Sequence, residues 1–316
     1  MSGVTRVAAV DCGTNSIRLL IADVEDGRLR DVVRRAEVVR LGHDVDRTGR
    51  LAPDALARTL DMTRQYAAAC QEHGATAVRF VATSATRDAS NTEQLTAGVR
   101  AALGVDPEVV SGAEEAALSF RGALSVLARP GQRDRPDAPY CVVDLGGGST
   151  EVVVGTTRPD AAWSMDVGSV RLTERHLRTD PPTPEETAAA TATVDAALDQ
   201  ALDHVPVAAV RTLVGLAGSV TTVTAHALGL ARYDRTRIDG AVLSVDQVLA
   251  ACDDLLHCTR AQRAALGFMH PGRADVVGAG ALVWSQVVRR VAAASGVQQV
   301  VTSEHDILDG IVLSLA

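Results

Sequence analysis

One Gly-rich phrase occurs twice in this chain, first as Asp11-Cys12-Gly13-Thr14-Asn15-Ser16 and again as Asp144-Leu145-Gly146-Gly147-Gly148-Ser149. In each copy a short apolar run enters the phrase and another leaves it, which is the pattern of a β-hairpin. Glycine lets a turn approach a ligand closely, so that consecutive N–H groups form an anion-binding concavity. The repeat therefore predicts two halves that grip one phosphate chain. Two tight hairpins without a ligand are the alternative.

Length and composition favour a two-domain globular protein. The chain has 316 residues, more than one ordinary core accommodates. Its five cysteines are odd in number and form no Cys-x-x-Cys pair, which argues against a disulfide framework or a structural zinc site. No apolar run is long enough to span a membrane, and the first residues lack a signal-peptide apolar region. We expect a cytoplasmic protein that does not bind membranes.

The charged residues restrict both partners and mechanism. A net charge of −8 disfavours nucleic-acid binding, and an anionic substrate would need local arginines, backbone N–H groups and a divalent cation. The sequence contains no lysine, so all 31 Lys+Arg positions are arginine. A Walker-type phosphate loop, a protein-kinase ATP site and Schiff-base chemistry all require lysine and are excluded.

The first half reads as strands followed by α/β structure. The pattern predicts strands near residues 6–11, 17–24, 28–40 and 78–82, and a helix that opens at Pro53. A polar loop over residues 83–88 follows the last of these strands, at the end where open α/β sheets bind ligands. Arg87 in this loop is a candidate phosphate contact, with a solvated surface arginine as the alternative.

A helix is expected after Ser111-Gly112, with Glu114 and Glu115 in its first turn. Carboxylates are favoured there by the helix dipole, so a purely structural role for both is the alternative to a catalytic one. Residues 129–137 are rich in Pro, Gly and charge and mark a domain junction.

The second half repeats the order of the first. A hairpin is expected over residues 140–155, a strand over 163–167, and a long helix after a capping box that begins at Thr183. A strand over 212–216 runs into a small, hydroxyl-bearing turn over 217–222. This turn is a further candidate phosphate or nucleotide loop through Gly218, Ser219 and Thr221. Later helices are expected to begin near residues 244, 259 and 273, with a strand over 298–302 and Ser303 as the cap of a final helix.

These motifs together resemble the exopolyphosphatase and guanosine pentaphosphatase (Ppx/GppA) family. The matching segments are Asp11–Ser16, Ala82–Arg87, Ser111–Ala116, Asp144–Glu151, Gly168–Arg171 and Pro271–Asp275. The resemblance implies an α/β protein of two actin-like (ribonuclease H-like, ASKHA superfamily) domains with the active site in the cleft between them. Residues 1–124 would form the first domain, with the helix of 304–316 packing back on it, and residues 125–303 the second.

The resemblance also implies roles for individual residues. Glu115 would be the general base, and Asp144 and Glu151 would organise Mg²⁺, with Mn²⁺ as a substitute, and the attacking water. Phosphate contacts would come from Asp11, Gly13, Thr14, Asn15, Ser16 and Arg87 in the first domain, and from Gly146, Gly147, Gly148, Ser149 and Thr150 in the second. The chain resembles a short form without the C-terminal helical domain, for which we expect weaker gripping of long polyphosphate. It also has Leu308-Asp309-Gly310 where many relatives have Leu-Arg-Glu-Gly.

The expected activity is Mg²⁺-dependent release of orthophosphate from the end of inorganic polyphosphate. Hydrolysis of guanosine pentaphosphate, a small-molecule kinase or ATPase of the same fold, and a non-enzymatic sensor of polyphosphate or an alarmone are the alternatives. The resemblance favours a homodimer.

Overall fold

The computed structural model describes residues 4–127 and 136–315, so most of the predicted junction over residues 129–137 lies outside the described part. Residue contacts divide the chain into two compact units. Unit 1 comprises the residues up to Ser125 together with those from Asp306 onward, and unit 2 comprises Val126–His305. These limits differ from the predicted domain limits by one or two residues, and the assignment of the units as independent domains stays a prediction.

Unit 1 is built on a five-stranded mixed sheet in the order β3-β2-β1-β4-β5. The strands β1, β2 and β3 are antiparallel neighbours, whereas β4 pairs in parallel with β1 and β5 in parallel with β4. Its strands are β1 (Thr5–Cys12), β2 (Ser16–Glu25), β3 (Arg28–Val38), β4 (Ala77–Ala82) and β5 (Glu108–Val109). Its helices are α1 (Val45–Thr48), α2 (Pro53–Glu72), α3 (Ser84–Asp88), α4 (Glu93–Leu103), α5 (Gly112–Leu127, which ends just beyond the unit) and α13 (Ile307–Leu313).

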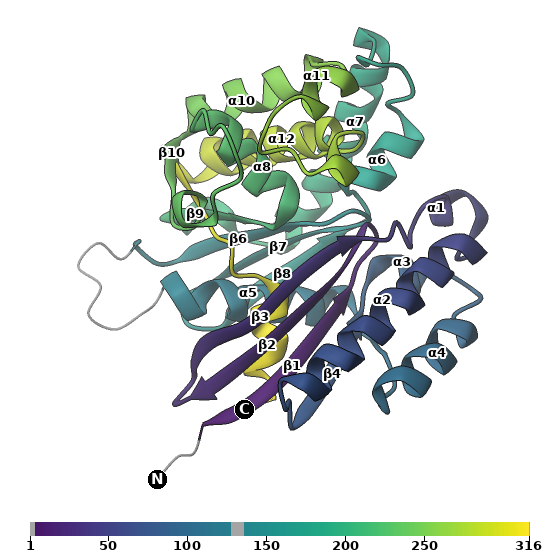
Figure 1. Ribbon diagram of the computed structural model, residues 1–316. Helices are drawn as coiled ribbons and strands as arrows, with labels where there is room; N and C mark the ends of the chain where they lie inside the picture. Colours follow the sequence, from purple (N-terminus) through teal and green to yellow (C-terminus); the bar gives the residue numbers. More distant parts are fainter. Residues whose placement is uncertain (1–3, 128–135, 316) are drawn as a thin grey trace. The chain divides into compact units, whose positions relative to one another are not determined.

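Helices cover both faces of this sheet (Figure 1). Alternate residues of a strand point to opposite faces, so Ala8 and Val10 of β1 join the core beneath α2, whereas Val7 and Ala9 join the core formed with α5 and α13. Asp11 lies two residues after Ala9 and therefore points to the same face as Val7 and Ala9. The period-2 pattern of β1 therefore directs this carboxylate to the face covered by α5 and α13.

Unit 2 repeats the arrangement with a six-stranded sheet in the order β10-β11-β9-β6-β7-β8. Its strands are β6 (Tyr140–Leu145), β7 (Thr150–Gly155), β8 (Pro159–Met165), β9 (Thr212–Leu216), β10 (Val242–Ser244) and β11 (Gln299–Thr302). Its helices are α6 (Ser169–Arg175), α7 (Pro184–His204), α8 (Ala217–Ala227), α9 (Arg235–Ile238), α10 (Val245–His257), α11 (Arg260–Ala264) and α12 (Val277–Ser295). In both units an antiparallel meander of three strands is followed by two parallel strands on the side of its first strand. In unit 2 the edge strand β10 then pairs antiparallel with β11.

The repeated Gly-rich phrase forms equivalent turns in the two units. The β1–β2 ladder ends at the pair Cys12 and Ile17, and the β6–β7 ladder ends at the pair Leu145 and Thr150. In the first turn the Gly13 N–H donates to the Ser16 carbonyl at 2.9 Å, and in the second Gly146 donates to Ser149 at 3.0 Å. The two predicted hairpins are confirmed.

Two segments expected to be loops are helical. Residues 84–88 form α3, because the Thr83 carbonyl accepts the N–H groups of Thr86 and Arg87 and so closes a helical turn. Residues 217–222 are the first turns of α8, where Ala217 takes a positive φ of 69°. In both cases small and hydroxyl-bearing residues at a strand end tolerate a helix as readily as a turn.

Two predicted helix starts are wrong. Residues 271–273 form a short 3-10 turn, and the helix expected near Arg273 begins at Val277. Asp306 rather than Ser303 caps α13, because Asp306 and Asp309 form a capping box while the Ser303 hydroxyl accepts the N–H of His305. Within residues 4–127 and 136–315, no helix is both long and apolar enough to cross a membrane.

Candidate active site

Unit 1 gathers charged side chains at the carboxyl end of β1. Asp11 lies directly opposite Arg18 in the β1–β2 ladder, so the two side chains share one face of the sheet. Both Nε and Nη2 of Arg18 donate to Asp11 Oδ2, at 2.8 and 2.6 Å, and Nη1 of the same arginine pairs with Asp306. Burial raises the pKa of Asp11, and the charge of Arg18 opposes that rise.

Glu115 is the buried acid of this group. It lies in the first turn of α5 and is 8% exposed. Arg87 Nη1 donates to Glu115 Oε2 at 2.7 Å and to the Val110 carbonyl at 2.9 Å, and the Thr83 hydroxyl donates to the same carboxylate. Burial raises the pKa of Glu115, Arg87 and Thr83 oppose that rise, and the charge of Asp11 adds to it. A carboxylate whose pKa is raised is a stronger base than a free one, which suits general base chemistry.

Arg87 was predicted to contact phosphate, but in the structure its side chain binds Glu115 and the Val110 carbonyl. In the described part of the chain, the hydrogen bonds of its guanidinium group involve Nη1 alone. Its side chain is 22% exposed. Holding Glu115 is therefore its observed interaction, and the phosphate contact stays a prediction.

The first Gly-rich turn is supported by the segment after β3. The Asn15 carbonyl accepts N–H groups from Val39 and Arg40, and the Thr14 carbonyl accepts the N–H of Gly42. A Cβ at Gly42 would lie 2.3 Å from Thr14 Cγ2, so only glycine permits this approach. The sequence analysis missed this support, for which Gly42 is the one sequence signal.

Unit 2 places two buried carboxylates on one face of its sheet. Asp144 and Glu151 are directly opposite in the β6–β7 ladder and are 7% and 1% exposed. The Ser164 hydroxyl donates to Glu151 Oε1 at 2.7 Å. Mg²⁺ is commonly held by one or two carboxylates together with substrate phosphates and water, so this donor set fits the ion. Among the described residues, no third His, Cys, Asp or Glu completes a three-ligand cluster with the pair.

The second Gly-rich turn rests on the start of α6. The Gly146 carbonyl accepts the N–H of Ser169, and the Gly147 carbonyl accepts those of Val170 and Arg171. Arg171 Nε also donates to the Gly148 carbonyl at 2.8 Å. Within residues 4–127 and 136–315, no hydrogen-bond partner is found for the N–H groups of Gly147 and Gly148. Two consecutive unpaired N–H groups are the donors that an anion-binding concavity requires.

The remaining phosphate-loop candidates have mainly local contacts. The Thr150 hydroxyl donates to the Val167 carbonyl at 2.6 Å, and Ser149 is buried within the turn. In α8, the Thr221 hydroxyl donates to the Gly218 carbonyl at 3.3 Å, and Ser219 packs against Gly280 of α12. The guanidinium of Arg273 lies so close to Gly218 that a Cβ there would stand 2.3 Å from Cζ. A phosphate or nucleotide role for this turn stays a prediction.

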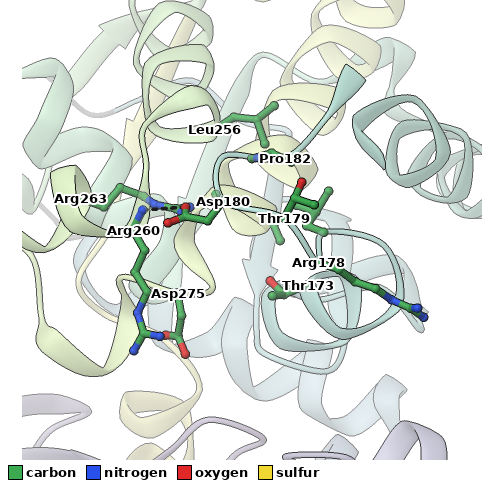
Figure 2. A pocket seen from close by; sticks show the side chains of 12 residues that line it. Thr173, Arg178, Thr179, Asp180, Pro182, Leu256, Arg260, Arg263 and Asp275 are labelled. Atoms are coloured by element: carbon green, nitrogen blue, oxygen red, sulfur yellow. Dashed lines mark hydrogen bonds and ion pairs between the residues drawn. The ribbon is translucent and has the colours of Figure 1, made fainter. Parts of the chain in front are cut away.

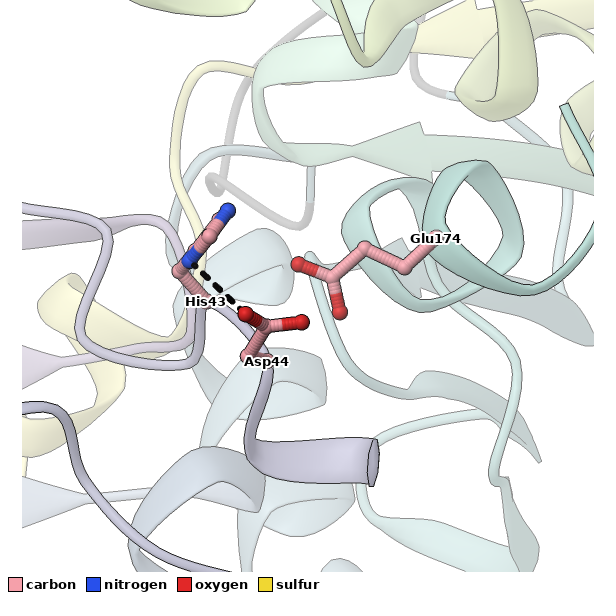
Figure 3. Close-up of side chains that lie close together, drawn as sticks. All are labelled: His43, Asp44 and Glu174. Atoms are coloured by element: carbon pink, nitrogen blue, oxygen red, sulfur yellow. Dashed lines mark ion pairs between the residues drawn. The ribbon is translucent and has the colours of Figure 1, made fainter. Parts of the chain in front are cut away.

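Two acidic residues outside these groups are drawn in Figure 3. In unit 1, His43 Nδ1 lies 3.8 Å from Asp44 Oδ2 just before α1. Glu174 belongs to α6 in unit 2.

Three further residues of unit 1 were not predicted as site residues. They are Arg18, which pairs with Asp11, Asp306, which pairs with Arg18, and Thr83, which contacts Glu115. Arg18 carries the clearer signal, since it is a charged residue seven positions after Asp11 within the otherwise apolar run of residues 17–22. Asp306 and Thr83 become recognisable only when distant segments are brought together.

Repeated α/β units, paired Gly-rich turns and buried carboxylates define an enzyme of actin-like fold that acts on phosphoryl groups. The Ppx/GppA phosphatase family profile matches residues 20–315. The chain therefore belongs to the Ppx/GppA phosphatase family and is a phosphoanhydride hydrolase.

Individual relatives agree with this placement. The chain is 50% identical over 321 aligned residues to Exopolyphosphatase 2 of Mycobacterium tuberculosis, with 99% of each chain covered. The crystal structure of an exopolyphosphatase-like protein is 48% identical, with a TM-score of 0.95 over 99% of this chain and 98% of the other. The Aquifex aeolicus Ppx/GppA enzyme is 30% identical, with a TM-score of 0.80 over 99% and 100% of the two chains. The predicted α/β, actin-like fold is confirmed.

Proposed function

We propose that this protein is a Mg²⁺-dependent exopolyphosphatase that releases orthophosphate from the end of inorganic polyphosphate. The observation that carries the proposal is Glu115, a buried carboxylate with a raised pKa, held by Arg87 and Thr83. The relationship to Exopolyphosphatase 2 over the full length supports the choice of substrate.

Hydrolysis of a terminal phosphoanhydride needs a positioned water, an acceptor for its proton and neutralisation of the phosphoryl oxygens. Glu115 accepts the proton of the attacking water in this proposal, and Arg87 keeps its carboxylate ionised and oriented. The donors proposed for phosphate oxygens are Nε and Nη2 of Arg87, together with the backbone N–H groups of Gly147 and Gly148.

Asp144 and Glu151 are the residues that would hold Mg²⁺. When bound, the ion neutralises negative charge on the substrate phosphates. Asp11 is a carboxylate and offers no donor, so its proposed contribution is to hold Arg18 in place rather than to contact phosphate directly.

The test measures orthophosphate release from short and long polyphosphate, with Mg²⁺ and with EDTA. Glu115→Gln is expected to lower kcat by about 10²- to 10⁴-fold while binding of polyphosphate persists. Glu114→Gln is the matched control, because Glu114 lies one residue away but pairs with Arg79 at 2.8 Å and is half exposed. Equal loss of activity in both variants, or full activity of Glu115→Gln, would contradict the proposed base.

The same assay, run with guanosine pentaphosphate and with ATP, distinguishes the alternative functions. Faster turnover of guanosine pentaphosphate than of polyphosphate would reassign the substrate within the family. Turnover of ATP only with an acceptor would indicate a kinase, and binding without turnover of any substrate would indicate a sensor. The homodimer stays a prediction, which light scattering of the full chain measures.

A further inference from the structure

Unit 2 contains a pocket formed by the segment between α6 and α7, the end of α10, α11 and the start of α12. Its volume is about 170 Å³, room for several water molecules or one small anion. Three arginines and two aspartates line it, an excess of one positive charge in a chain whose net charge is −8. Figure 2 shows Arg263 and Asp180 reaching toward each other, while Arg178 extends away from that pair.

Arg263 is the unusual member of this group. The residue is 5% exposed, yet the one hydrogen bond of its side chain among the described residues joins Nη2 to Asp180 Oδ1 at 3.3 Å. Its Nε is fully buried and has no partner in the described part of the chain. A buried N–H donor without a partner is costly, so this Nε is the atom of Arg263 that a bound acceptor would satisfy.

The fold is shaped to accept this arginine. A Cβ at Gly278 of α12 would lie 2.3 Å from Arg263 Nη1, so glycine is needed for the guanidinium to lie there. Asp180 only partly neutralises the charge, because it is half exposed and its Oδ1 also accepts the backbone N–H of Arg260 at 2.7 Å. The negative charge of Asp275, which also lines the pocket, adds to the effect of Asp180 on Arg263.

Arg178 and Thr179, which form another wall of the pocket, are held in place by protein contacts alone. Glu186 of α7 accepts the backbone N–H groups of Arg178 and Thr179, at 3.2 Å each, and also pairs with the Thr179 hydroxyl. The wall therefore needs little ordering when an anion binds, and that lowers the entropic cost of binding.

We propose that this pocket is an accessory binding site for a small oxyanion, with Arg263 as its buried donor and Arg260 at its rim. Orthophosphate is the proposed occupant. The choice of orthophosphate rests on the proposed function, because orthophosphate is the product of that reaction. The existence of an oxyanion site does not depend on the proposed function.

α6 connects the pocket to the second Gly-rich turn. The helix lines the pocket with Thr173 and holds the turn through the N–H groups of Ser169, Val170 and Arg171. An anion in the pocket thus contacts the same short helix that supports Gly146 and Gly147.

The test is equilibrium dialysis of the full chain with radiolabelled orthophosphate in the presence of EDTA, which requires no hydrolysis. Arg260→Ala is expected to weaken binding about threefold, as suits an exposed charge. Arg263→Gln is expected to weaken it tenfold or more, since a buried charged hydrogen bond is lost. Asp180→Asn is expected to tighten binding about threefold, because a competing carboxylate is neutralised while Oδ1 still accepts the N–H of Arg260.

Arg289→Ala is the matched control, because Arg289 is an exposed arginine on α12 away from the pocket, and it is expected to leave binding unchanged. Should Arg263→Gln fail to fold, Arg260→Ala and Asp180→Asn still carry opposite expected signs. Unchanged affinity in both of these variants would overturn the proposal. A second series with tripolyphosphate separates the sources of the anion: if the pocket variants alter tripolyphosphate binding alone, orthophosphate is not the occupant.

Discussion

Opposing electrostatic influences act on Glu115. Its burial favours the neutral acid, whereas the ion pair with Arg87 and the hydroxyl of Thr83 favour the carboxylate. Thr83 also accepts the backbone N–H of Arg87 through its carbonyl. One residue at the end of β4 thus positions both members of the Glu115–Arg87 pair.

The acid limb of the pH–rate profile is expected to report this balance. Thr83→Val removes a hydrogen bond that lowers the pKa of Glu115, so the pKa rises and the limb moves to higher pH. Thr83→Ser keeps the hydroxyl and is expected to leave the limb in place. The measurement is kcat/KM for polyphosphate against pH, and a limb that does not move in Thr83→Val would show that this hydroxyl does not tune Glu115.

Replacement of Glu115 is expected to separate activity from stability. Because the folded-state pKa of Glu115 lies above its unfolded value, the folded state binds more protons, and stability falls as pH rises between the two values. Above the folded-state pKa the cost of the buried carboxylate is present in full, and Glu115→Gln removes it.

The expected thermal midpoint of Glu115→Gln at pH 7 is therefore equal to or above that of the wild type, and this advantage disappears below the unfolded pKa. Thermal denaturation across pH checks it. A lower midpoint at pH 7 would mean that the ion pair with Arg87 outweighs the burial cost.

At the scale of elements, α5 and α13 cross with glycine on both sides. A Cβ at Gly122 of α5 would lie 1.8 Å from the Asp306 carbonyl oxygen, and one at Gly310 of α13 would lie 2.0 Å from that of Leu118. These contacts hold the helix that carries Glu115 against the helix whose cap, Asp306, pairs with Arg18.

Gly310→Ala is expected to destabilise the protein by about 1–3 kcal/mol, because the added methyl group forces the two helices apart. Gln200→Ala on the exposed side of α7 is the control and should change stability by less than about 0.5 kcal/mol. Denaturant unfolding measures both. Equal stability of the two variants would show that the helices shift without cost.

At the scale of the whole molecule, the chain begins in unit 1, forms unit 2, and returns to unit 1 with α13. Apolar residues of α13 complete the core on one face of the first sheet, together with Val7, Ala9 and Leu20. Unit 1 is therefore finished only by the last residues of the chain.

Deletion of residues 306–316 is expected to unfold unit 1 while unit 2 keeps its core. Hydrogen exchange should then show loss of protection in β1 and β2 and retained protection in β6, β7 and β9, which serve as the internal control. Retained protection in β1 and β2 would show that α13 is dispensable for the sheet.

The sequence by itself determined the features that depend on near neighbours along the chain. The two Gly-rich turns and the capping box at Thr183 follow from local propensity and spacing, and the order of motifs led to the family. Glu115 was predicted as the base from a contiguous motif, and its role stays a prediction. Where two local solutions were available, the pattern favoured the wrong one: Ser303 was predicted to cap the final helix, whereas Asp306 caps it.

Only the tertiary structure decided which distant groups meet. The pairing of Arg18 with Asp306, the hydrogen bond of Thr83 to Glu115 and the pocket around Arg263 join segments separated by tens to hundreds of residues. Their energies arise from burial and charge, which depend on what surrounds a side chain rather than on what precedes it. Strand order and helix packing set those surroundings, which cannot be predicted from the pattern of neighbouring residues in the sequence.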